Sequence, residues 1–360
     1  MNVDLTIKNY RCFPDSSPAR IAIRKGFTAL LGPNNSGKSS LLKFFYELRN
    51  LFIVLSTPDS GNVLAALRGD AQPFGLQGVQ DLPELYSNLN NRDISIQFDF
   101  TPTSDDPQPT GMTPRSLTVT LTRNHNLFKI ANLTTNTGVA APLPNLDFLV
   151  GGTIGHSGTQ TAHLAPIQDA IRPLANTVYL AAFRNTINAG AQQNYYDIPV
   201  GQAFLRAWKQ LKGGTVKQTA DATVRLTRDI QRIFGFNYLE INTSADESTL
   251  QVVVNDRTFR LDELGSGLSQ FILVLATIAS RQQHFILIDE PELNLHPSLQ
   301  MDFLTTVASY ARDGVLFGTH SIGLARAVGQ QVTHSKERRK AQHRSDFMMT
   351  FLGSRNSWAN

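Results

Sequence analysis

The sequence predicts an α/β fold in which a sheet carries helices on both faces and further strands and helices are inserted. The last third of the chain alternates short apolar strands with helical segments, which is typical of a parallel sheet. The apolar run Phe27–Leu31 predicts another buried strand, and a glycine-rich turn and a segment with helical spacing follow it. Residues 93–100 and 116–122 alternate with period two and predict half-buried strands, so the sheet structure as a whole should be mixed.

The N-terminal elements follow from short apolar runs bounded by turn residues. The expected strands are Val3–Ile7, Arg20–Ile23 and Phe27–Leu31. A helix should begin after the glycine-rich turn and continue through Leu55, where the turn residues of Thr57–Gly61 stop it.

The middle of the chain is harder to interpret, because residues 60–165 contain long stretches rich in Pro, Asp, Thr and Gly besides the two alternating strands. From residue 177 onward the pattern is regular again. The expected elements are a strand at Thr177–Phe183, helices at Gly201–Leu211 and Thr219–Phe234, a hairpin of Leu250–Asn255 and Arg257–Leu261, a helix from Gly267 to about Gln282, a strand at Phe285–Asp289, a helix at Pro297–Arg312, a strand at Val315–Thr319 and a helix at Ile322–Val328.

The composition predicts a globular cytoplasmic protein. Of the 360 residues 41% are hydrophobic, and no apolar run approaches the roughly 20 residues of a membrane-spanning helix. The single cysteine, Cys12, excludes an internal disulfide and suits a reducing compartment. The net charge of +4 arises in residues 330–360, which hold six Lys or Arg and two acidic residues. The basic run Lys336–Lys340 has two interpretations, electrostatic binding of nucleic acid or a solvated chain end.

The glycine-rich turn reads GPNNSGKS and matches the phosphate-binding loop G-x-x-x-x-G-K-[ST] at every fixed position. A strand, this turn and a helix start together direct backbone N–H groups and the helix dipole toward a polyphosphate, here ATP. Lys38 should reach the β- and γ-phosphates, and the Ser39 hydroxyl should bind Mg²⁺. The residues expected to contact the nucleotide are Gly32, Pro33, Asn34, Asn35, Ser36, Gly37, Lys38, Ser39 and Ser40.

Acidic residues follow the buried strand Phe285–Asp289. At the carboxyl edge of a parallel sheet, Asp289 and Glu290 would face the crevice where ligands bind. Asp289 is expected to hold Mg²⁺ through water, and Glu290 to act as the general base that orients the attacking water. His320 ends the next strand at the same edge, which favours a role as sensor of the γ-phosphate.

A third element, Gly265-Ser266-Gly267, opens a long apolar helix about 20 residues before the acidic strand. This helix start cannot easily cap the nucleotide that the phosphate loop already wraps. We therefore expect Ser266 and Gly267 to bind the γ-phosphate held by a second copy, which predicts an ATP-sandwiched homodimer.

In this order, the elements resemble the ABC-type ATPase heads of the SMC, RecF and OLD (overcoming-lysogenization-defect) group. The resemblance includes the turn Pro291–Pro297, which reads PELNLHP, and the Thr-His-Ser sequence around His320. The opening segment Leu5–Phe13 looks like the first strand and turn of that group, in which the arginine matching Arg11 often reaches the nucleotide.

The resemblance covers residues 1–55 and 177–328, with an inserted region at about 60–176. It implies a P-loop NTPase fold of the ABC-type ATPase head over residues 1–328, with Mg²⁺-dependent ATP hydrolysis. The glutamine that contacts magnesium in such heads is left open between Gln97 and Gln160.

Two details are typical of the OLD-like branch: the phosphate loop written GPNNSGKS and followed by two leucines, and Gly265–Gln270 (GSGLSQ) in place of LSGGQ. Ser39 and Ser266 are 227 positions apart, and the pattern between them predicts strands and short helices rather than a coiled coil, which disfavours SMC proper. The same long spacing disfavours transporter subunits, whose signature follows the phosphate loop much sooner. OLD-like nucleases continue into a Toprim domain, but no matching acidic motif follows Val328. Residues 329–360 are expected to form a basic, disordered or truncated tail.

The resemblance implies an ATP-hydrolysing dimeric switch in DNA-related processes such as anti-phage defence or repair, with DNA and a separate effector nuclease as partners. Three alternatives stay open: an ATP-gated scaffold with negligible turnover, a truncated OLD-family nuclease and a transporter motor. The motif spacing disfavours the transporter, and no membrane partner is expected.

Overall fold

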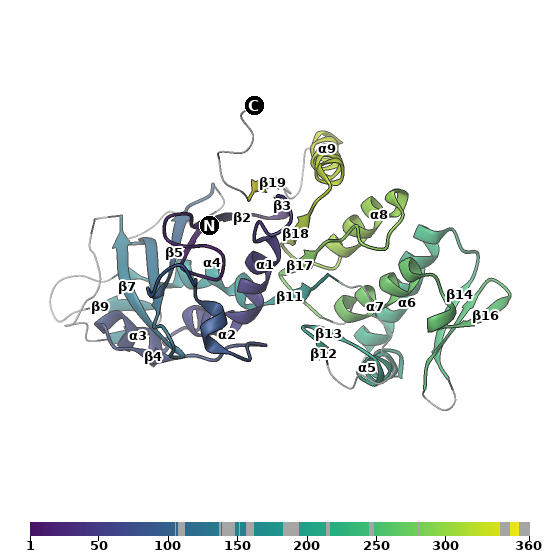
Figure 1. Ribbon diagram of the computed structural model, residues 1–360, viewed down its shortest axis with the longest axis horizontal. Coiled ribbons are helices and arrows are strands. Elements are labelled where there is room, and N and C mark those ends of the chain that lie inside the picture. Colours follow the sequence, from purple (N-terminus) through teal and green to yellow (C-terminus); the bar gives the residue numbers. More distant parts are fainter. Residues whose placement is uncertain are drawn as a thin grey trace. The chain divides into compact units, whose positions relative to one another are not determined.

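The computed structural model describes residues 1–104, 106, 112–136, 138, 148–150, 152–155, 162–182, 194–213, 217–244, 248–279, 281–338 and 346–352. The chain divides into two compact units, whose elements are labelled in Figure 1. Unit 1 comprises Met1–Lys25, Pro33–Thr177 and Thr350–Asn360, and unit 2 comprises Gly26–Gly32 and Val178–Met349. Within the described ranges, no helix is long and apolar enough to cross a membrane.

Unit 1 is built on a six-stranded antiparallel sheet with the order β2-β1-β5-β6-β7-β4. Its strands are β1 Asn2–Lys8, β2 Ala19–Ile23, β4 Gln72–Pro73, β5 Ile94–Thr101, β6 Pro114–Leu121 and β7 Leu127–Thr135. Side chains alternate between the core and the opposite face, so that Val3, Leu5 and Ile7 of β1 are buried and the residues between them are half-buried. The predicted alternating strands at residues 93–100 and 116–122 are confirmed as β5 and β6.

The helices of unit 1 pack aromatic side chains against this sheet. They are α1 Lys38–Glu47, α2 Arg49–Ser56, α3 Gly61–Arg68, the short 3-10 helix η1 Leu82–Leu85 and α4 Ala165–Ala175; a small sheet holds β8 Phe148–Val150, β9 Thr153–Gly155 and β10 Ala162–His163. Phe52 of α2 meets Phe98 of β5 edge-on, with ring centroids 6.3 Å apart. The expected single helix through Leu55 is wrong, because the backbone of Leu48 (φ −99°, ψ 14°) departs from helical geometry and separates α1 from α2.

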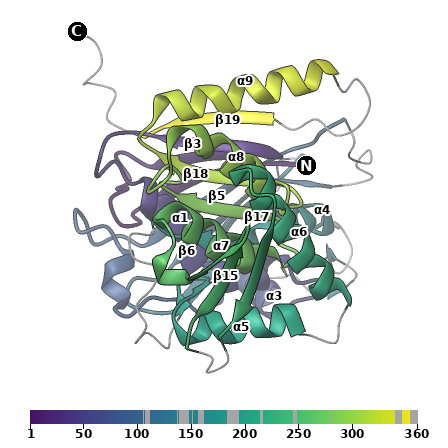
Figure 2. The same ribbon diagram turned by 90° about the vertical axis from the view of Figure 1, so that its right-hand side faces the viewer.

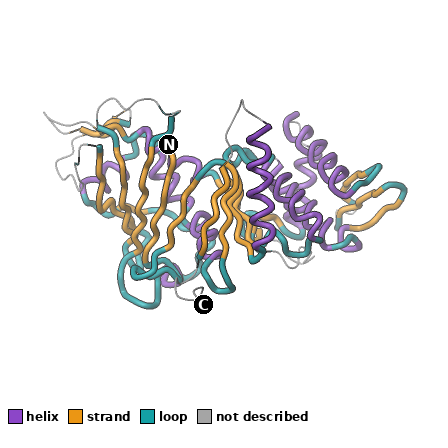
Figure 3. The backbone as a smooth tube through the Cα atoms, turned by 90° about the horizontal axis from the view of Figure 1, so that it is seen from above, coloured by secondary structure: helices purple, strands orange, loops and turns teal. Residues whose placement is uncertain are grey.

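Unit 2 contains a five-stranded sheet with the order β11-β17-β18-β3-β19, whose strands lie side by side in Figure 3. They are β3 Gly26–Leu31, β11 Thr177–Leu180, β17 Phe285–Asp289, β18 Gly314–Thr319 and β19 Asp346–Phe351. β17, β18 and β3 are parallel neighbours, with Leu287 opposite Leu316 and Leu316 opposite Thr28. β17 and β18 are buried along their whole length, as expected for strands covered on both faces.

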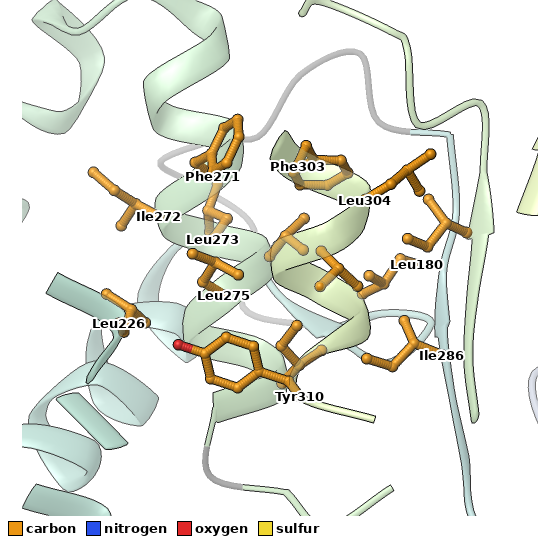
Figure 4. Close-up of a cluster of buried hydrophobic side chains, with 14 of the residues drawn as sticks. Leu180, Leu226, Phe271, Ile272, Leu273, Leu275, Ile286, Phe303, Leu304 and Tyr310 are labelled. Atoms are coloured by element: carbon orange, nitrogen blue, oxygen red, sulfur yellow. The ribbon is translucent and has the colours of Figure 1, made fainter. Parts of the chain in front are cut away.

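Helices supply the rest of the unit 2 core. They are α5 Gln202–Gly213, α6 Lys217–Phe234, α7 Ser266–Ala279, α8 Pro297–Ala308 and α9 Ile322–Arg338. The remaining elements of unit 2 are short strands and one 3-10 helix: β12 Asn194–Tyr195, β13 Ile198–Pro199, β14 Leu239–Thr243, β15 Leu250–Val254, β16 Arg257–Arg260 and η2 Leu261–Glu263. Phe271 of α7 packs edge-on against Phe303 of α8, with ring centroids 4.9 Å apart. Figure 4 shows these rings in one cluster with Leu180 of β11 and Ile286 of β17.

The C-terminal end differs from the expected disordered tail. Helix α9 continues past Val328 to Arg338, and β19 joins the sheet beside β3, beneath α9 in Figure 2. A six-residue strand is stabilised by its partner strand, and no local pattern reveals a pairing with a segment more than 300 residues earlier. Residues 339–345 and 353–360 lie outside the described residues.

Candidate functional site

Three parallel strands of unit 2 end at the same edge of the sheet. In the register of these strands Asp289 pairs with Gly318, and Thr319 pairs with Leu31. The carboxyl ends of β17, β18 and β3 therefore lie next to one another. This edge is where ligands bind in open α/β sheets, and Gly32, the first residue of the phosphate loop, follows β3 directly.

The two acidic residues at the end of β17 have different surroundings. Asp289 is the last residue of the strand and is only 6% exposed. Glu290 has φ 51°, in the left-handed region that non-glycine residues rarely adopt. Its N–H donates to the carbonyl of Gly318 at 2.8 Å, so the neighbouring strand holds this strained backbone in place.

The structure brings His320 to Glu290, as the strand order predicted. The His320 Nε2 lies 3.3 Å from Oε1 of Glu290, and the two side chains are 35% and 24% exposed. Both groups can therefore reach a bound substrate from solvent. The proton-accepting role of Glu290 and the γ-phosphate contact of His320 stay predictions.

Glu292, to which the sequence interpretation assigned no role, lies next to the candidate residue His320. Its Oε1 accepts a hydrogen bond from the Thr319 hydroxyl at 2.7 Å and another from the N–H of His320 at 3.0 Å. In the sequence Glu292 belongs to the turn Pro291–Pro297, which carried part of the family resemblance but no assigned role. Its bonding partners become visible only when β18 is placed beside β17.

The phosphate loop itself belongs to unit 1 from Pro33 onward. Pro33, Asn34, Asn35 and Ser39 are exposed, and a helix begins at Lys38 as predicted. Lys38 is 5% exposed, and its Nζ donates to the carbonyl of Pro33 at 2.9 Å. The loop backbone therefore bends back so that the carbonyl of Pro33 contacts the Lys38 ammonium, while Pro33, Asn34, Asn35 and Ser39 remain exposed and accessible to a ligand.

Gly37 is required by the geometry of this loop. It has φ 93°, and a Cβ at this position would overlap the ring of Phe13 and approach Sγ of Cys12 to 2.7 Å. The opening turn of the chain is therefore packed directly against the last glycine of the loop.

Arg11 lies in that opening turn but is engaged by side chains of unit 1. Its guanidinium forms an ion pair with Glu47 of α1, and its Nε lies 3.2 Å from the Tyr10 hydroxyl. Tyr10 donates to Glu47 at 2.6 Å, and burial together with the Glu47 charge raises the pKa of Tyr10 well above its usual value. The predicted contact of Arg11 with the nucleotide stays a prediction.

The helix with the Gly-Ser-Gly start is observed as α7, which begins at Ser266 with Gly265 and Ser266 exposed. A Cβ on Gly267 would lie 3.4 Å from the carbonyl oxygen of Asn294. The helix start therefore packs beside the turn that follows Glu290 and Glu292. Its contact with ATP in a second copy stays a prediction.

Two further sequence predictions concern metal contacts. The Gln97 amide donates to Asp99 at 2.9 Å on the sheet of unit 1, and Gln160 lies outside the described residues. In the part of the chain that the structure describes, no group of three or more His, Cys, Asp and Glu is arranged to hold a metal ion.

Comparison with known proteins gives one family match. The model of the AAA ATPase domain family matches residues 1–119 and 172–325. No protein with a curated description matches the chain.

Similar solved structures include the SMC head domain from Thermotoga maritima, which is 16% identical, with 91% of this chain and 92% of that chain covered and a TM-score of 0.38. Another is an SmcHead bound to the C-winged helix domain of ScpA, 13% identical, with 89% and 90% covered and a TM-score of 0.44. A third is an Smc head domain with an extended coiled coil bound to the C-terminal domain of ScpA derived from Pyrococcus furiosus, 13% identical, with 91% and 92% covered and a TM-score of 0.39.

Proposed function

The chain belongs to the family of AAA ATPase domains, whose P-loop α/β fold the sequence predicted, and from this premise we propose that it hydrolyses ATP as a homodimeric switch. The observation that carries the proposal is the pairing of Glu290 with His320 at the strand ends beside β3, the strand that leads into the phosphate loop. A carboxylate and an imidazole at this edge suit the transfer of a phosphoryl group to water.

Each residue has a stated role in this proposal. The loop N–H groups and the Lys38 ammonium bind the β- and γ-phosphates, exchanging the Lys38–Pro33 hydrogen bond for contacts with phosphate oxygens. Glu290 orients the attacking water and accepts its proton. His320 donates a hydrogen bond to the γ-phosphate and thereby senses its presence.

Magnesium fits the donors that the chain offers. The hydroxyl of exposed Ser39 and the carboxylate of Asp289 are hard oxygen ligands, and Mg²⁺ in phosphate sites keeps several waters, so few protein ligands suffice. When bound, the ion would neutralise charge on the β- and γ-phosphates.

The sequence features of the OLD-like branch support a finer proposal. The loop GPNNSGKS and the segment Gly265–Gln270 favour an ATPase that controls a separate effector nuclease in DNA-related defence or repair. The exposed start of α7 at Ser266 supports closure of two copies over ATP. The single cysteine is our reason to propose a reducing cytoplasmic compartment.

The direct test is phosphate release from Mg²⁺-ATP by the full chain and by two variants. Lys38→Ala should lose ATP binding, and Glu290→Gln should bind ATP but turn it over roughly 10²- to 10⁴-fold more slowly. Glu84→Gln, at an exposed glutamate of η1, is the matched control and should behave as the wild type. Tight ATP binding by Lys38→Ala would refute the loop assignment, and full turnover by Glu290→Gln would refute the general base.

Dimer closure is tested by the solution mass of Glu290→Gln with and without Mg²⁺-ATP. A doubling of the mass with ATP supports the switch, and an unchanged mass with ATP bound contradicts it. An ATP-gated scaffold would dimerise in the same way but would keep its biological function in Glu290→Gln, whereas a hydrolytic switch would lose it.

A further inference from the structure

The Glu292 carboxylate joins two chain segments that carry the proposed catalytic groups. It lies on the turn after β17, two residues beyond Glu290, and its Oε1 receives hydrogen bonds from Thr319 and His320 at the end of β18. One carboxylate oxygen therefore links the loop that carries the base to the loop that carries the imidazole. Hydrogen bonds to an ionised acceptor are among the stronger ones in proteins.

The bonds around Glu292 fix three consecutive residues. The Thr319 hydroxyl, which donates to Glu292, also accepts from the N–H of Ser321 at 2.9 Å, and Thr319 is fully buried. Ser321 in turn accepts from the N–H of Leu324 at 3.1 Å in the first turn of α9. The backbone on both sides of His320 is thus held, which restricts where its ring can lie.

We propose that Glu292 is a positioning residue that holds the His320 imidazole beside Glu290. This inference rests on the proposed function, because it assigns to Glu292 the geometry of that same site. Glu292 acts through Thr319 and the His320 backbone and does not itself touch the substrate. The other carboxylate oxygen, Oε2, is buried and has no hydrogen-bond partner among the described residues.

The location of the two accepted bonds makes an isosteric test possible. In Glu292→Gln the amide oxygen can accept both hydrogen bonds at the Oε1 position, and the amide NH₂ occupies the position of Oε2. In Glu292→Ala both bonds are lost. A positioning role therefore predicts that glutamine rescues what alanine removes.

For Glu292→Ala we expect kcat for ATP to fall about 10- to 100-fold, because small misplacements of catalytic groups have effects of this size. KM and ATP affinity should stay within about twofold, since the phosphate loop is untouched. Glu292→Gln should restore kcat to within about threefold of the wild type, and the control Glu84→Ala should change nothing. An unchanged kcat in Glu292→Ala, or an equal loss in Glu292→Gln, would overturn the proposal.

A double-mutant cycle separates positioning from general damage. If Glu292 acts through the imidazole, adding Glu292→Ala to His320→Ala should lower kcat no further. If instead the fold-losses in kcat of the two single variants multiply in the double variant, Glu292 acts independently of His320 and the inference is refuted.

A measurement without turnover separates this inference from the proposed function. In histidine-labelled protein, the imidazole NMR signal that His320→Ala removes should shift in Glu292→Ala and keep its wild-type position in Glu292→Gln. If the wild type hydrolyses no ATP, the proposed function fails, but the imidazole signal still tests the positioning. If that signal is the same in all three proteins, the positioning is wrong.

Discussion

Replacing Gly37 by alanine should damage the phosphate loop through two separate physical effects. The first is the backbone: at φ 93° an L-residue loses about 1–2 kcal/mol relative to glycine. The second is steric, because the added Cβ would overlap the Phe13 ring and lie 2.7 Å from Sγ of Cys12. Overpacking of this kind costs about 1–3 kcal/mol.

Together these effects predict that Gly37→Ala loses about 2–5 kcal/mol of unfolding free energy. Because the distorted residue lies in the loop that binds phosphates, ATP affinity should fall as well. Urea unfolding measures the first quantity, and titration calorimetry with ATP measures the second.

The two effects can be separated by removing the Phe13 ring. In a Phe13→Ala background the overlap with the ring is removed and only the close approach to Cys12 Sγ remains. The additional loss from Gly37→Ala should therefore be smaller than in the wild type and approach the backbone part of about 1–2 kcal/mol. An equal loss in both backgrounds would refute the packing of Phe13 against Gly37 as the reason for glycine.

Three further predictions follow from other parts of the chain. Ser266→Arg, at the exposed start of α7, should leave ATP binding by the monomer intact and prevent the ATP-dependent doubling of mass; loss of monomer binding would contradict its role in the second copy. Glu47→Ala removes a buried carboxylate that pairs with the partly exposed Arg11 and accepts a hydrogen bond from the buried Tyr10 hydroxyl. It should lower the unfolding free energy by about 1–3 kcal/mol, which urea unfolding can measure, and an unchanged unfolding free energy would contradict these contacts. Burial, followed by the nearby Asp93 charge, raises the pKa of Tyr86 from 10.0 to about 12. Between these values only the unfolded chain loses the Tyr86 proton, so stability falls as the pH rises through this window. Tyr86→Phe should therefore flatten the loss of thermal stability between about pH 10 and pH 12, and an unchanged slope would contradict this assignment.

The sequence alone predicted the elements that carry the proposed chemistry, because each depends on a local pattern. The phosphate-loop motif is recognisable from eight consecutive residues, and the structure confirms the helix predicted to begin after its glycine-rich turn. Asp289 and His320 end apolar runs that could be identified as parallel strands. Because the carboxyl ends of neighbouring parallel strands lie at the same edge of a sheet, Glu290 and His320 were expected to be close. In the structure Nε2 of His320 lies 3.3 Å from Oε1 of Glu290.

Where the pattern is weak, prediction failed. Helices α3 and α4 and strands β7 and β14 were not expected. Strand β7 illustrates the cause. Its pairing with β6 contains a register shift, which interrupts the alternation of buried and exposed side chains along the strand. The sequence of β7 therefore does not show a regular period of two. The strand β19 was missed because it depends on pairing with the distant strand β3 rather than on a local pattern. The break at Leu48 lies within a continuous helical pattern of letters and has no Gly or Pro to mark it.

What the sequence by itself determined was which residues are candidates to bind phosphate, hold an ion and activate water, because the motifs that nominate them are local in identity and spacing. What only the tertiary structure decided was which side chains hold those residues in place. Glu292 bonds to residues 27 and 28 positions away, and Arg11 bonds to Glu47 36 positions away. Such contacts depend on strand register and helix packing across the whole fold, and the spacing of letters in a chain carries no record of them.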